Sequence, residues 1–137
     1  MNKTTLWKHF ASFLYDIFPL LGLFIVTSLV VAIIRKGDIV AQHTLWFDAL
    51  IFSEMTLYYV YSWKLGGQTL GMRAWKIKIV PNDERLNLTW LQAFTRFIIG
   101  IASTLLLGIG LFWKLASKNN QSWMDLASRS KTINVEK

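Results

Sequence analysis

Three long apolar segments dominate the pattern of hydrophobic and polar positions along the chain. The first covers residues 10–34, where Asp16 is the only charged residue. A helix crosses a hydrocarbon core of roughly 30 Å with about 20 residues. We therefore expect residues 10–34 to form a membrane-spanning helix that carries a carboxylate near its first turns.

A second apolar segment, residues 45–63, follows a short polar connection that contains Gly37 and Asp38. Its aromatic residues gather near its two ends, which is typical of helices that cross a membrane interface. Asp48 and Glu54 lie inside the segment. The pattern therefore predicts a second span with a carboxylate near its middle.

The third apolar segment, residues 89–113, begins with an amphipathic stretch for which Thr89 is the candidate N-cap. Residues 97–113 carry no charge, so one straight span is the simplest interpretation. The alternative is a helix that breaks around Gly108 and Gly110 and turns back, because glycines weaken a helix interior. The apolar pattern alone is compatible with both arrangements.

The polar region between the second and third segments predicts a small β structure. Residues 75–79 alternate between apolar and basic side chains after a glycine-rich turn, which predicts a strand over about residues 74–80. A turn signal covers residues 81–84. Residues 130–135 alternate in a similar way. Because an isolated strand leaves its backbone groups unpaired, we expect these two segments to form a short β pair.

The distribution of basic residues favours a re-entrant third segment. The chain has 15 Lys and Arg and a formal net charge of +7. Basic loops stay on the cytoplasmic side of a membrane. With a cytoplasmic amino terminus, a re-entrant third segment places 13 basic residues inside and 2 outside, whereas a single span gives 8 and 7. We expect an all-α membrane protein, one domain over residues 1–137, with three apolar helical segments and a cytoplasmic β pair.

The composition argues against several functional classes. The chain has no cysteine, which removes thiol catalysis, disulfide frameworks and thiolate metal sites. No Ser-His-Asp set or metal-ligand cluster stands out, so we expect no enzyme activity, no catalytic residue, no metal and no cofactor. No basic helix or aromatic stripe of the RNA-binding kind appears apart from the apolar segments, so we expect no nucleic-acid partner. The lipid bilayer is the expected partner.

Asp16 and Glu54 are the candidate residues for handling ions or protons. A carboxylate inside a bilayer costs several kcal/mol unless it is paired, hydrated or protonated. Glu54 shares a helix face with Tyr58 and Tyr61, because they are spaced i, i+4 and i+7. For both carboxylates, the alternative to ion handling is a structural interaction that orients the helices.

Arg96 carries a fixed charge at the start of the third segment, so we expect it to pair with a carboxylate. The candidate partners are Asp16, Glu54 and Asp125.

A separate feature is the stretch of residues 66–73, which has three glycines. Its spacing is neither a P-loop nor a dinucleotide fingerprint, and a tight turn explains it as well as an anion cradle does.

Several of these stretches together carry a family pattern. They are Trp-Lys-His-Phe-Ala-Ser-Phe-Leu-Tyr-Asp at 7–16, Gly-Gly-Gln-Thr-Leu-Gly-Met-Arg-Ala-Trp-Lys-Ile-Lys-Ile-Val at 66–80, Arg96, and Ser-Trp-Met-Asp-Leu-Ala-Ser-Arg-Ser-Lys-Thr-Ile at 122–133. With them the chain resembles the RDD family of bacterial multi-pass membrane proteins over nearly its whole length. The most specific part is Gly-Gln-Thr-Leu-Gly followed by a strand, which makes motif residues of Gly67, Gln68, Thr69 and Gly71.

The family is named for one arginine and two aspartates, and the resemblance maps the aspartates onto Asp16 and Asp125. Members carry the arginine about two helical turns before the first aspartate. This chain has Lys8 and His9 there. Positive charge can be kept at that place, but the bidentate geometry of a guanidinium is lost.

The resemblance implies a location in the bacterial cytoplasmic membrane. It also implies cation or proton transport, because some members are thought to act as sodium or proton antiporters. Three helical segments are too few to enclose a transport path, so such a path would need a homo-oligomer or a membrane-protein partner. The alternative is a non-transporting accessory protein whose β pair docks a membrane partner.

Overall fold

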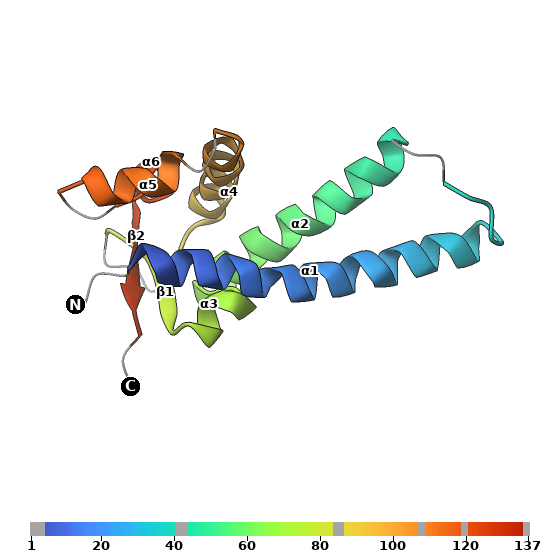
Figure 1. Cartoon of the computed structure of the whole chain (residues 1–137), viewed down its shortest axis with the longest axis horizontal. Coiled ribbons are helices and arrows are strands. Elements are labelled where there is room, and N and C mark those ends of the chain that lie inside the picture. The colour runs from blue at the N-terminus through green and yellow to red at the C-terminus, as the bar shows by residue number, and fades with distance from the viewer. Residues whose placement is uncertain (1–4, 41–43, 84–86, 107–108, 119–120, 136–137) are drawn as a thin grey trace.

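The computed structural model of the chain describes residues 5–40, 44–83, 87–106, 109–118 and 121–135. Its largest feature is a hairpin of two long helices, α1 (Leu6–Ile34) and α2 (Leu45–Gly66), which diverge toward the connection between them (Figure 1). Among the described residues, α1 is the one helix that is long and apolar enough to cross a membrane. The first predicted span coincides with the greater part of α1.

The second predicted segment lies within α2, which is less apolar than α1. Asp48, Glu54 and Lys64 lie along this helix. It ends at Gly67, whose φ of 65° is in the left-handed region that favours glycine. The secondary structure of the segment is therefore as expected, and its passage through a bilayer stays a prediction.

The third apolar segment is not one continuous helix. Helix α4 covers Trp90–Leu105 and a separate helix α5 covers Ile109–Ala116, which runs in a different direction in Figure 1. Thr89 is the N-cap of α4, because its side chain accepts a hydrogen bond from Gln92 N at 3.2 Å. Of the two glycines at the expected break, Gly110 lies inside α5 and Gly108 lies outside the described residues.

The predicted β pair is confirmed. Strand β1 (Ile77–Pro81) pairs in antiparallel fashion with β2 (Ser130–Asn134), and Ile79 lies opposite Thr132 at the centre. The predicted start of the first strand at residue 74 is wrong, because helix α3 (Leu70–Ala74) occupies that position. We call α3, helix α6 (Trp123–Ala127) and the two strands the head.

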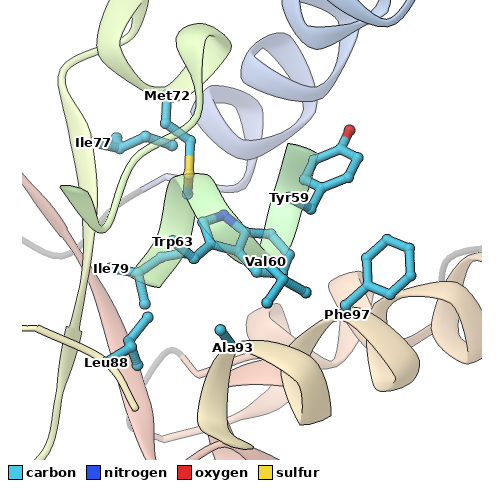
Figure 2. Packing of buried hydrophobic residues seen from close by; sticks show 9 residues of the cluster. All are labelled: Tyr59, Val60, Trp63, Met72, Ile77, Ile79, Leu88, Ala93 and Phe97. Atoms are coloured by element: carbon cyan, nitrogen blue, oxygen red, sulfur yellow. The ribbon is translucent and has the colours of Figure 1, made fainter. Parts of the chain in front are cut away.

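The hydrophobic core lies where the head meets the carboxyl-terminal half of α2 and the start of α4. Figure 2 shows its side chains, which come from α2, α3, β1, the loop before α4, and α4: Tyr59, Val60, Trp63, Met72, Ile77, Ile79, Leu88, Ala93 and Phe97. By contrast, the α1–α2 hairpin leaves large apolar side chains exposed along its length. Such surface is costly in water, so it calls for lipid or for another protein.

Candidate functional site

Asp16 on α1 is the centre of a buried hydrogen-bond cluster. Its carboxylate accepts hydrogen bonds from Tyr58 Oη at 2.7 Å, Thr69 Oγ1 at 2.6 Å and the Gly71 backbone N–H at 2.9 Å. Only 2% of Asp16 is exposed. Three hydrogen bonds compensate a buried carboxylate well. We call these four residues the Asp16 cluster, which joins α1 to α2 and to the start of α3.

The turn between α2 and α3 is held against β1 by backbone and side-chain hydrogen bonds. Ile79 N donates to Gly67 O at 2.8 Å, and Gln68 Nε2 donates to the Ile77 carbonyl oxygen at 2.8 Å. A Cβ at Gly67 would lie 2.5 Å from the Ile79 carbonyl oxygen, so only glycine fits there. The turn therefore presents the first residues of α3 to Asp16.

Gly71 allows α3 to pack directly against α1. A Cβ at this position would overlap the Ser12 carbonyl oxygen. Thr69 Oγ1 also accepts a hydrogen bond from Met72 N at 3.2 Å and thereby caps α3. The glycine-rich stretch is thus a tight turn, and the anion that it holds is the carboxylate of Asp16.

Arg96 on α4 is completely buried and pairs with Asp125 among the three candidate carboxylates. Arg96 Nη1 donates to Asp125 Oδ1 at 2.6 Å and to Ser130 Oγ at 2.9 Å, and Nη2 donates to Thr132 Oγ1 at 3.2 Å. The guanidinium also lies 5.6 Å from the centre of the Trp63 ring. The Arg96 side chain thus ties α4 to α6, β2 and α2.

Asp125 is held in place by its own helix as well as by Arg96. Its second oxygen accepts hydrogen bonds from Ser122 N and Ser122 Oγ, each at 3.0 Å. Burial by itself raises the pKa of the Asp125 carboxyl. The electrostatic interactions with Arg96 and His9 and the hydrogen bonds from Arg96 and Ser122 outweigh this effect, so its pKa lies below the ordinary 3.8.

Glu54 lies apart from these two buried clusters. It is half-buried on α2. Its carboxylate accepts a hydrogen bond from Thr27 Oγ1 of α1. The expected polar stripe on α2 is divided, because Tyr58 belongs to the Asp16 cluster and Tyr61 is exposed. Glu54 and Asp16 therefore have different surroundings.

Lys8 and His9 have different surroundings. Lys8 Nζ donates to Asn134 Oδ1 of β2 at 3.0 Å and is half-buried. His9 is buried, and its electrostatic interaction with Asp125 contributes to lowering the pKa of that carboxyl. Lys8 therefore contacts the sheet, whereas His9 interacts electrostatically with Asp125.

Two hydroxyl groups that were not predicted from the sequence complete the Arg96 site. Ser130 and Thr132 lie on the buried face of β2, whereas Lys131 between them is half-exposed. Successive side chains of a strand point to opposite faces. Two hydroxyl side chains at alternate positions of a predicted strand were therefore the signal for a buried polar partner.

One family model matches most of the chain. Residues 3–129 match the RDD family, a range that includes Lys8, Asp16, Arg96 and Asp125. No curated protein and no solved structure gives a significant match. Within the described residues, no three His, Asp or Glu side chains form a group that could hold a metal ion. Family membership and the apolar helix α1 together indicate a membrane protein. The chain belongs to the RDD family.

Proposed function

We propose that this protein resides in the bacterial cytoplasmic membrane, where the α1–α2 hairpin crosses the bilayer and Glu54 takes part in the movement of protons or cations. We assign no enzyme activity to the chain. Transport requires a homo-oligomer or a membrane-protein partner, because two long helices cannot enclose a transport path by themselves. Family membership and the apolar composition of α1 support the membrane location.

The β pair supports a topology in which both termini lie in the cytoplasm. Residues 77–81 and 130–134 are joined by hydrogen bonds, so they lie on the same side of any bilayer. The intervening residues must then cross the bilayer an even number of times or not at all. This arrangement also places 13 basic residues on the cytoplasmic side and 2 on the other side.

The state of Glu54 is the observation that carries the proposed transport role. Asp16 accepts three hydrogen bonds and Asp125 is paired with Arg96, so both serve the packing of the head against the helices. Glu54 accepts one from Thr27 and remains half-buried near the middle of α2. A carboxylate has room for about four such bonds. Glu54 therefore keeps acceptor capacity for a proton or a cation.

A flux assay in proteoliposomes tests this role. The natural chain and a Glu54→Gln variant are reconstituted, a pH or sodium gradient is imposed, and its decay is followed with a dye. We expect at least a tenfold slower decay for Glu54→Gln, because the amide cannot exchange a proton. Asp48→Asn, in the exposed first turn of α2, is the matched control and keeps the natural rate. A natural chain without flux would contradict the proposal.

A second candidate is an accessory protein that docks a membrane partner. It is favoured by the exposed apolar surface of the hairpin, on which Ile25, Leu29 and Leu57 are each more than half exposed. Lipid or helices of another protein could cover this surface. Crosslinking in native membranes, followed by purification, distinguishes the two candidates. An accessory role predicts one stoichiometric partner and no flux in either the natural chain or Glu54→Gln.

A further inference from the structure

Two segments of the head repeat the same series of structural features at a constant offset of 53 residues. Each begins with a hydroxyl N-cap, Thr69 or Ser122, and continues with a helix of five residues. Each then has a basic residue with positive φ, Lys76 at 52° or Arg129 at 48°, and a strand of five residues. The repeated positions include three identities: Gln68 and Gln121, Ala74 and Ala127, Lys78 and Lys131.

The pairing of the strands obeys a twofold axis that relates these segments. The axis passes between Ile79 and its partner Thr132, which are 53 positions apart. Ile77 pairs with Asn134, and Pro81 pairs with Ser130. The offset relates Ile77 to Ser130 and Pro81 to Asn134, so the twofold axis converts one pair into the other.

The symmetry continues beyond the strand ends. Val135 N donates to Lys76 O at 2.7 Å, and Asn82 N donates to Arg129 O at 3.0 Å. These two bonds also exchange under the twofold axis, because Asn82 corresponds to Val135 and Lys76 to Arg129. The strand pair and the two hydrogen bonds that flank it are therefore symmetric.

The helices before each segment follow the same relation. In the first half α1 packs on α3, and in the second half α4 packs on α6. Across the halves, α2 contacts α4 and α5 contacts α1. The close approach is conserved with exchanged residues: Gly71 of α3 meets Ser12 of α1, whereas Met124 of α6, at the same repeat position, meets Gly100 of α4.

We infer that the chain consists of two copies of one unit, and that α4 and α5 are the shortened second copy of the α1–α2 hairpin. We take the twofold axis of the head as the membrane normal, so that both hairpins face the same leaflet. Helix α4 has 16 residues, which give about 24 Å of length, less than the roughly 30 Å of a hydrocarbon core. The second hairpin therefore enters that leaflet and returns, with its outer face against lipid acyl chains.

The side chains of the second hairpin fit an acyl-chain environment. Leu91, Leu105 and Phe112 are exposed by 76%, 78% and 60%. Trp90 begins α4 and Trp113 lies near the end of α5, so both tryptophans are at the mouth of the hairpin beside the head. Tryptophan prefers this interfacial position, whereas leucine and phenylalanine prefer the hydrocarbon. The inference depends on membrane anchoring by α1 but not on transport.

Spin labels on single cysteines test the inference directly, since the natural chain has no cysteine. The labels are placed at Leu105 and Phe112, at Leu29 of α1 as the lipid reference, and at Lys76 as the water reference. Relaxation by oxygen, which concentrates in acyl chains, is compared with relaxation by a water-soluble nickel complex in proteoliposomes. We expect the oxygen-to-nickel ratio at Leu105 and Phe112 to match Leu29 and to exceed Lys76 at least fivefold.

The possible outcomes separate the inference from the membrane anchor. Water-like ratios at Leu105 and Phe112 with a lipid-like ratio at Leu29 overturn the inference and leave the anchor intact. A water-like ratio at Leu29 overturns both. A label at Ile98, which is exposed in the middle of α4, replaces any labelled variant whose circular dichroism shows a changed helix content. Lipid-like ratios at two of the three positions support the second hairpin.

Discussion

Gly71 shows most directly how one residue controls the arrangement of two helices, α1 and α3. Its backbone N–H donates to Asp16, and its missing side chain lets α3 contact the backbone of α1 at Ser12. The motif around Gly71 was visible in the sequence as a tight turn. The sequence did not reveal Asp16 as the carboxylate partner of Gly71, because Asp16 lies 55 residues earlier and no local pattern relates the two residues.

Gly71→Ala tests this close approach. The added methyl group overlaps a backbone carbonyl, which cannot rotate away, so we expect the free energy of unfolding to fall by about 3 kcal/mol. The measurement is thermal unfolding in detergent, followed by circular dichroism. Gly22→Ala in α1 is the control, because nothing lies within 4 Å of its added methyl. There we expect a gain of about 0.5–1 kcal/mol from reduced backbone entropy. Equal effects would contradict the assigned role of Gly71.

The short helices and strands show how far elements could be predicted from the sequence. Alternation indicated both strands, and apolar length indicated α1 and α2. The start of β1 was missed because Trp75 and Lys76 continue the alternation of the strand, whereas Thr69 caps a helix that ends at Ala74. The interruption between α4 and α5 was one of two alternatives, since apolar composition is the same in a broken and a continuous helix.

Lys76 and Arg129 connect the short helices to the strands in a conformation that side chains disfavour. Their φ values of 52° and 48° lie in the left-handed region, which costs an ordinary residue about 1–2 kcal/mol relative to glycine. We expect Lys76→Gly and Arg129→Gly each to raise the free energy of unfolding by about 0.5–1 kcal/mol, because relief of this cost exceeds the added chain entropy. Thermal unfolding in detergent measures both.

The matched control is Lys78→Gly, within β1. Lys78 is in an extended strand, where glycine destabilises by about 0.5–1 kcal/mol. The twofold relation of the head predicts effects of the same sign and similar size at the two left-handed positions. A loss at either Lys76 or Arg129 would show that its side chain contributes more than its backbone conformation costs.

On the scale of the whole molecule, the Arg96–Asp125 pair joins the apolar helices to the head. Arg96 belongs to α4, and its partners Asp125, Ser130 and Thr132 belong to α6 and β2. The sequence indicated that Arg96 needed a carboxylate but left three candidates. The choice depends on the antiparallel β pair, which brings the end of the chain back against α4. Long-range strand pairing is the information that the local pattern lacked.

This pair makes the stability of the molecule depend on pH in acid. The pKa of Asp125 in the folded state lies below the ordinary 3.8, so the unfolded state binds a proton first as the pH falls. The stabilisation is complete above about pH 4 and is lost as the pH falls from there through the lower folded pKa. We expect the thermal midpoint in detergent to drop over this range.

Asp125→Asn removes this part of the pH dependence and lowers the free energy of unfolding by about 3–5 kcal/mol at neutral pH, because Arg96 stays charged and buried. Asp38→Asn, at an exposed carboxylate, keeps the natural profile. An unchanged acid slope in Asp125→Asn would assign the pH dependence to another group.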